Sequence, residues 1–150
     1  MIKGIIFDFN RTLFDPEKWA LVEGAPEILN KLTGSFQFCL VTTGERKRTE
    51  KLKESNLDKM FKKIIFVQGE HKDKKHFLEC AQAMGLKPDE VLVVGDKIKA
   101  EIRVGNSLGM KTAWFKFGKY SRILPDSKDE EPTYTITKLD ELYSVLEKEK

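Results

Sequence analysis

Six short apolar runs recur along the chain, and each ends in polar or turn-forming residues. They span Ile2–Phe9, Phe36–Val41, Lys63–Val67, Val91–Val94, Lys111–Phe115 and Tyr134–Ile136. The first four runs are continuous rather than alternating, which is typical of strands that are covered on both faces. The pattern therefore predicts a buried sheet with a layer of other structure on each side.

Between these runs, apolar residues recur at steps of three and four, as in helices with one buried face. The predicted helices are Pro26–Leu32, Glu45–Ser55, Lys74–Met84, Ala100–Leu108 and Leu139–Glu147. Because strand and helix alternate throughout, we predict an α/β fold with a doubly wound parallel sheet sandwiched by helices. No repeat or low-complexity linker divides residues 1–150, so we expect a single domain, with Tyr120–Pro132 as a surface loop.

Composition excludes several classes of protein. The net charge is only +3, and basic residues are interleaved with acidic ones, so nucleic-acid binding is not expected. No apolar stretch approaches the ~18 residues of a membrane span, and the start of the chain lacks the order of a signal peptide. We therefore expect a cytoplasmic protein without membrane contact. Cys39 and Cys80 lack the close spacing of a metal or redox motif and are predicted to be reduced core residues.

Polar residues collect at the carboxyl ends of the predicted strands, where open parallel sheets bind ligands. Asp8 and Asp96 follow two of the strands, and carboxylates brought together in this way are tolerated when a divalent cation lies between them. The segment Thr42, Thr43 and Gly44 offers donors to a tetrahedral anion, and Lys72 would neutralise further charge. These residues predict a magnesium and phosphate site, in which Asp8 could attack phosphorus and form an aspartyl-phosphate.

Four segments in order, FDFNRTLFD, LVTTGE, Lys72 and VLVVGDKIKAE, resemble the four motifs of the haloacid dehalogenase-like superfamily. The segments GLKPDEVLVVGD and NSLGMKTAW are similar to its phosphatase branch. The resemblance covers nearly the whole chain and implies a magnesium-dependent phosphohydrolase or phosphotransferase.

The resemblance also implies roles for individual residues. Asp8 would be the nucleophile and a magnesium ligand, together with the main-chain carbonyl of Asn10, Asp96 and Glu101. Thr42, Thr43, Gly44 and Lys72 would hold the phosphoryl group. Lys74 and Lys75 lie close to Lys72, but Lys72 fits the third motif best by its distance from Phe77.

Asn10 departs from the phosphatase pattern, in which a second Asp protonates the leaving oxygen and then activates water. An amide cannot exchange a proton near neutral pH, and general acid–base catalysis contributes about 10²–10⁴ in rate. Asn10 is therefore compatible with three alternatives: a weakened or redirected phosphatase, a non-catalytic module that binds magnesium and phosphate, and, less favoured because Asp96 is present, a dehalogenase. An Asp-to-Asn replacement made to trap a phospho-enzyme is another origin of Asn10. Arg11, which stands where the family commonly has Gly, favours a native residue and could contact a substrate anion or cover the entrance.

Only ten residues separate Asp15 from the helix that starts near Pro26, too few for the cap domain that many family members insert there. We expect a capless, open site. The substrate would be a small phosphorylated compound or a phosphorylated macromolecule. Specificity would come from a partner protomer in a homo-oligomer, from a large substrate, or from the loop Phe14–Gly24, which contains Trp19.

Overall fold

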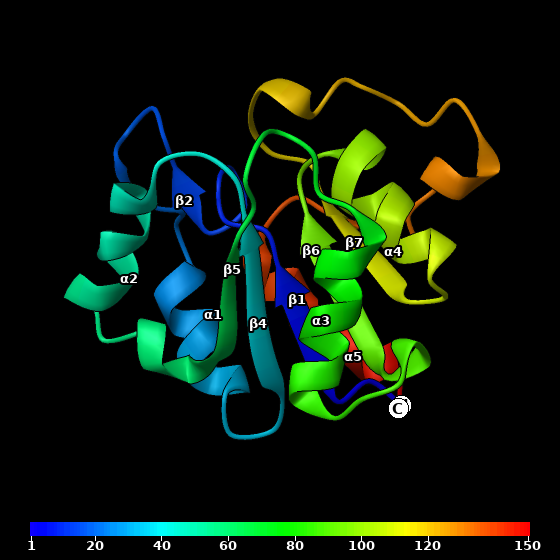
Figure 1. The fold of residues 1–150 in the computed structure, drawn as a ribbon, viewed down its shortest axis with the longest axis horizontal. Helices are drawn as coiled ribbons and strands as arrows, with labels where there is room; N and C mark the ends of the chain where they lie inside the picture. Colours follow the sequence, from blue (N-terminus) through cyan, green and yellow to red (C-terminus); the bar gives the residue numbers. More distant parts are fainter.

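The computed structural model describes residues 1–150 and is built on a six-stranded parallel sheet in the order β5-β4-β1-β6-β7-β8 (Figure 1). The strands are β1 (Gly4–Phe7), β4 (Gln37–Thr42), β5 (Phe61–Phe66), β6 (Val91–Gly95), β7 (Lys111–Phe115) and β8 (Tyr134–Ile136). All six predicted strands are present. The chain adds β4 and β5 on one side of β1, and then β6, β7 and β8 on the other. The strand order therefore reverses between β1 and β6, which is where open α/β sheets bind ligands.

The α-helices are α1 (Ala25–Leu32), α2 (Glu50–Glu54), α3 (Lys74–Met84), α4 (Arg103–Ser107) and α5 (Leu142–Lys148). Turns of another kind precede three of them: 3₁₀ turns at Arg46–Thr49 and Leu139–Glu141, and a π-helical turn at Ile98–Ile102. The predictions of continuous helices over Glu45–Ser55, Ala100–Leu108 and Leu139–Glu147 are wrong in this respect. The irregular segments Arg46–Thr49 and Ile98–Ile102 carry side chains of the candidate site, a common setting for non-α turns. Further 3₁₀ turns lie at Asp58–Met60, Pro88–Glu90, Gly118–Tyr120 and Lys128–Glu130.

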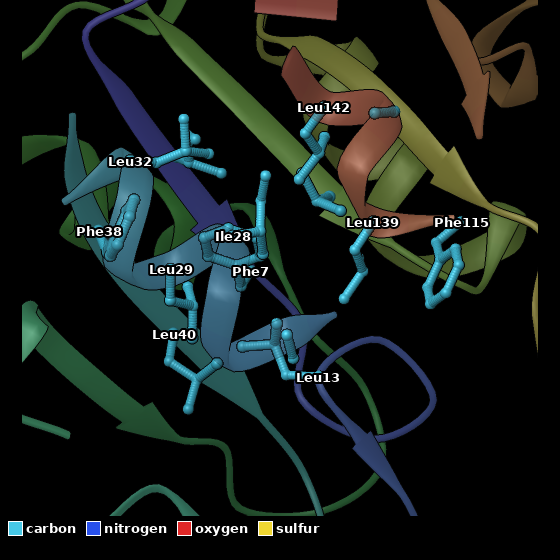
Figure 2. Packing of buried hydrophobic residues seen from close by; sticks show 14 of the residues in the cluster. Phe7, Leu13, Ile28, Leu29, Leu32, Phe38, Leu40, Phe115, Leu139 and Leu142 are labelled. Atoms are coloured by element: carbon cyan, nitrogen blue, oxygen red, sulfur yellow. The ribbon is translucent and has the colours of Figure 1, made fainter. Parts of the chain in front are cut away.

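Two apolar layers hold the sheet in place, because successive residues of a strand face opposite sides. One face packs against α1 and α5 and includes Phe7, Leu29 and Leu142, each fully buried (Figure 2). The other face packs against α3, where Ile6 of β1 meets Phe77. Burying a side chain such as Phe7 stabilises the fold by about 1.5–3 kcal/mol. β1 is therefore fixed from both sides, as is the residue that follows it.

The segment between β1 and α1 contains only a two-stranded antiparallel hairpin, β2 (Phe14–Asp15) and β3 (Ala20–Leu21). No further domain is inserted there, in agreement with the predicted capless fold. The hairpin itself was not predicted, because each strand has only two residues. None of the helices is both long and apolar enough to cross a lipid bilayer. Cys39 and Cys80 are buried as free thiols.

Candidate active site

The central strands β1 and β6 end side by side, and an aspartate follows each of them. The main-chain N–H of Asp8 donates to the carbonyl of Val94 in β6 at 2.9 Å. The carbonyl of Asp96 accepts a hydrogen bond from the indole of Trp114 in β7, also at 2.9 Å. Asp8 is 5 % exposed and Asp96 is 2 % exposed. The fold thus brings these two carboxylates together at the point where the strand order reverses.

Glu101 joins this pair from the π-helical turn that precedes α4. One carboxylate oxygen from each of Asp8, Asp96 and Glu101 lies within 4.8 Å of the others. Gly95 makes room for Glu101, since a Cβ at position 95 would lie 2.9 Å from both Cβ and Cγ of that residue. Oδ2 of Asp96 and Oε2 of Glu101 are buried and accept no hydrogen bond from the protein. Buried oxygens of this kind are unfavourable without a cation or a donor.

The pKa values of the three carboxyl groups respond to this crowding. Burial raises the pKa of Asp8 to about 6, against the opposing attraction of the Lys72 ammonium. Burial likewise raises the pKa of Asp96 to about 6, and burial together with the charge of Asp8 raises that of Glu101 to about 7. Ionising all three groups is therefore costly unless positive charge is added. The oxygen-only donor set and its unpartnered atoms fit Mg²⁺, a hard cation that prefers carboxylate ligands.

Lys72 supplies one positive charge to the cluster from the loop between β5 and α3. Its Nζ donates to Oδ1 of Asp8 and to Oε1 of Glu101, the latter at 2.9 Å, and its side chain is 5 % exposed. Burial alone would lower the pKa of Lys72, but the two carboxylates outweigh burial and raise it, so the amine stays protonated. Lys74 and Lys75 are exposed at the start of α3. Among the three neighbouring lysines, the structure brings Lys72 to the carboxylates.

The second predicted motif lies at the end of β4, and its residues differ in their access to the site. Thr43 lines the same cavity as the carboxylates, whereas Thr42 and Gly44 do not. Thr42 is 3 % exposed, and its hydroxyl donates to the carbonyl of Thr43 at 3.1 Å. Gly44 is exposed. In this structure Thr43 is thus the member of the segment that faces the cluster.

The side chain of Asn10 is held on both sides by other protein groups. Its Nδ2 donates to the carbonyl of Thr43 at 3.0 Å, and its Oδ1 accepts from Nη1 of Arg48 at 2.9 Å. The Arg48 guanidinium lies over the ring of Trp19, 5.4 Å from its centre. Trp19 is 39 % exposed and packs edge-to-face on Phe14 of the hairpin. The amide of Asn10 is therefore fixed by a cation on one side and by the main chain at the end of β4 on the other.

Arg48 was not identified from the sequence. It belongs to no motif, and a basic residue near the start of a helical segment resembles a surface residue. Its contact with Asn10 depends on the 3₁₀ turn Arg46–Thr49 and on the β2–β3 hairpin, neither of which the hydrophobic pattern indicates.

The cavity at the cluster measures about 90 Å³, and its rim includes Arg11, Lys97 and Tyr120. Pockets that enclose whole ligands usually measure about 300–1,000 Å³, so this one holds a small group and leaves the rest of a ligand outside. A larger cavity of about 540 Å³ lies between the hairpin, Phe115 and Leu139. It contains none of the clustered carboxylates, so the smaller cavity is the chemically equipped one.

The sequence of this chain is similar to a known protein family and to individual curated proteins. The family model described as haloacid dehalogenase-like hydrolase matches residues 1–115, which include every predicted site residue. The chain belongs to the haloacid dehalogenase-like hydrolase family. A glyceraldehyde 3-phosphate phosphatase from Pyrococcus furiosus is 35 % identical over 133 residues, which cover 85 % of this chain and 55 % of that protein. The chain thus spans about half the length of the curated relatives that it matches.

Solved structures of haloacid dehalogenase-like proteins have the same fold. The putative HAD-hydrolase YfnB from Bacillus subtilis, solved bound to magnesium, superposes with a TM-score of 0.71 at 28 % identity, over 85 % of this chain and 57 % of that one. A HAD phosphatase from Thermococcus onnurineus gives a TM-score of 0.79 at 18 % identity, over 97 % of this chain and 98 % of that one. The similarity to the Thermococcus onnurineus protein concerns the fold alone, and it covers nearly all of both chains.

Proposed function

We propose that this protein is a magnesium-dependent phosphohydrolase or phosphotransferase that forms an aspartyl-phosphate at Asp8. The observation that carries the proposal is the buried cluster of Asp8, Asp96 and Glu101, in contact with a protonated Lys72. Mg²⁺ held by these carboxylates and by the main-chain carbonyl of Asn10 would neutralise charge on a phosphoryl group and orient it. The substrate class is a small phosphorylated compound, as in the relatives that are named as glyceraldehyde 3-phosphate phosphatases.

The first chemical step is displacement at phosphorus. A carboxylate oxygen of Asp8 attacks, the Asp8–phosphorus bond forms, and the bond from phosphorus to the leaving oxygen breaks. Lys72 stays protonated and offsets negative charge on the phosphoryl oxygens. In the second step water or an acceptor hydroxyl attacks the same phosphorus, and the bond to Asp8 breaks. The carboxylate is regenerated, and the proton of the attacking water or hydroxyl passes to an oxygen of the phosphate product.

Asn10 determines which substrates suit this mechanism. Its amide is bonded to Arg48 and Thr43 and cannot give a proton to a leaving alkoxide or take one from water. Acyl and aryl phosphates, whose leaving groups need no proton, are the preferred reactants, and the phospho-protein is long-lived. The same observation favours the second candidate function, a module that binds magnesium and phosphate without turnover.

The two functions are separated by incubating the protein with Mg²⁺ and acetyl phosphate or para-nitrophenyl phosphate, while product release and protein mass are followed. We expect product and a mass gain of one phosphoryl group, both lost in Asp8→Asn. Asp89→Asn is the matched control. Asp89 is exposed and lies in the 3₁₀ turn between α3 and β6, so it precedes β6 at the end of the strand away from the carboxylate cluster. Product formation that survives in Asp8→Asn would refute the nucleophile. Binding of Mg²⁺ and phosphate without product or phospho-protein would establish the module instead.

A further inference from the structure

Three cationic side chains surround the ring of Tyr120 at the rim of the active-site cavity. The guanidinium carbon of Arg11 lies 5.2 Å from the centre of the ring, Nζ of Lys97 lies 4.8 Å from it, and Nζ of Lys119 lies 5.2 Å from it. Arg11 follows β1, Lys97 follows β6, and Lys119 and Tyr120 follow β7. These groups come together because the three strands are neighbours whose carboxyl ends share one edge of the sheet.

None of the three cations forms an ion pair with a carboxylate of the protein. Glu70 also lines the cavity, but it contacts none of them within ion-pair distance. The Tyr120 hydroxyl has no hydrogen-bond partner in the protein, although it is a competent donor. An aromatic face attracts each cation by about 0.5–1 kcal/mol at an exposed site, but like charges gathered around one ring repel each other. An anion placed among them would relieve this repulsion.

The backbone is shaped to hold Arg11 in this place. Arg11 has φ +61°, a left-handed conformation that is unfavourable for a residue with a Cβ. Its stem lies against Gly118, where an added Cβ would be 3.2 Å from Cδ of Arg11. Gly118 itself has φ +77°, so a side chain at position 118 would be strained as well as crowded. Two neighbouring loops thus adopt unusual conformations that leave Arg11 beside Tyr120.

The size of the cavity places the remainder of a substrate at this rim. The space beside Asp8 measures about 90 Å³ and suits one phosphoryl group, so the next groups of the substrate lie outside it. Arg11 and Lys97 line the mouth of that same cavity. A substrate bound through its phosphoryl group would therefore extend between these two cations.

We propose that Arg11, Lys97 and Lys119, arranged around Tyr120, form a subsite for a second anionic group of the substrate, a carboxylate or a second phosphate. This inference rests on the proposed function for the phosphoryl position, and it names the class of substrate. The compound that binds best is a small phosphorylated compound with another negative charge a few bonds from the phosphoryl group. It differs in this respect from glyceraldehyde 3-phosphate, for which four of the curated relatives are named.

The test uses two compounds with one carbon skeleton, glyceraldehyde 3-phosphate and 3-phosphoglycerate, in which a carboxylate replaces the aldehyde. Their affinities for the Asp8→Asn protein are measured by calorimetry in the presence of Mg²⁺, so that turnover does not enter. Charge-assisted hydrogen bonds predict that the carboxylate compound binds about 10-fold or more tightly. The double variant Arg11→Gln/Lys97→Gln, made in the same background, should reduce this ratio to near one. Lys62→Gln, at an exposed position on β5, should leave the ratio unchanged.

Two results would overturn the subsite. Equal affinities for the two compounds would show that no second anion is recognised. An equal loss for both compounds in the double variant would show that the cations serve only the phosphoryl group. Failure of the proposed function is a separate outcome: the preference for 3-phosphoglycerate would persist while the wild-type protein neither turned over acetyl phosphate nor became phosphorylated.

Discussion

The substitution Asn10→Asp tests whether only a proton carrier is missing from the site. From the sequence alone, this change should restore general acid catalysis and raise the turnover of alkyl phosphates by about 10²–10⁴. The structure adds Arg48, whose Nη1 lies 2.9 Å from Oδ1 of Asn10. In addition, the carbonyl oxygen of Thr43 lies 3.0 Å from Nδ2 and would face an oxygen of the introduced carboxylate. Both contacts alter what the new residue can do.

The magnitude follows from the ion pair. A cation at this distance lowers a carboxyl pKa by roughly 1–3, from an ordinary value of about 3.9. At pH 7 fewer than about one carboxyl in 10⁴ would then carry the proton that an alkoxide needs. We therefore expect Asn10→Asp alone to raise kcat for glycerol phosphate by less than about 10-fold, well short of the full contribution of a general acid. The double variant Asn10→Asp/Arg48→Gln should gain at least about 10², because burial and the nearby carboxylates then raise the pKa of the new group.

The assay compares kcat for glycerol phosphate with kcat for para-nitrophenyl phosphate at constant Mg²⁺. The second substrate should change little in every variant, because nitrophenolate leaves without a proton. Arg48→Gln alone is the control for structural damage, and it should leave the ratio of the two rates unchanged. A full gain in Asn10→Asp alone would refute the role given to Arg48. No gain in the double variant would place the defect outside the proton transfer.

Two further predictions concern stability and metal binding. The carboxyl groups of Asp8, Asp96 and Glu101 have raised pKa values in the folded protein, so in EDTA their stabilising contribution is present below pH ~4 and is lost as the pH rises through 6–7. Each such carboxyl contributes at most roughly 3 kcal/mol, and Lys72, whose pKa is raised, stays charged throughout. The melting temperature in EDTA should therefore fall between about pH 4 and 7. Mg²⁺ should remove most of this fall, and a flat profile without metal would contradict the assignment. Gly95→Ala should destabilise the protein by about 1–3 kcal/mol and weaken Mg²⁺ binding, because the new Cβ would lie 2.9 Å from Glu101. Urea unfolding measures the first effect and metal titration the second. Unchanged values in both would show that the π-helical turn carrying Glu101 shifts freely.

Much of the fold could be predicted from the sequence because its strands are continuous apolar runs with polar ends. The boundaries of Lys111–Phe115, Tyr134–Ile136 and Lys74–Met84 match the structure residue for residue. The π-helical turn at Ile98–Ile102 and the β2–β3 hairpin could not be predicted in the same way. They depend on how side chains pack at the carboxyl edge of the sheet, and a periodicity of 2 or 3.6 does not report such contacts.

The residues of the candidate site also fall into two groups, those that the sequence predicts and those that depend on tertiary packing. Asp8, Asp96, Lys72 and Glu101 occupy positions fixed by strand ends or by motif spacing, and the structure brings these four side chains together. Arg48, Lys119 and Tyr120 reach the site only through tertiary structure, and no pattern in the sequence singles them out. Arg11 and Lys97 directly follow Asn10 and Asp96, and of these two the sequence pointed to Arg11 as a contact for a substrate anion.

The hydrogen bond from the Asp8 amide to Val94 lies between the two innermost strands of the sheet. Such an amide exchanges with deuterium only when the whole domain opens, whereas amides near the hairpin exchange through local fluctuations. The Asp8 amide should therefore report global opening, and its protection factor would measure directly how rarely the candidate nucleophile leaves its place.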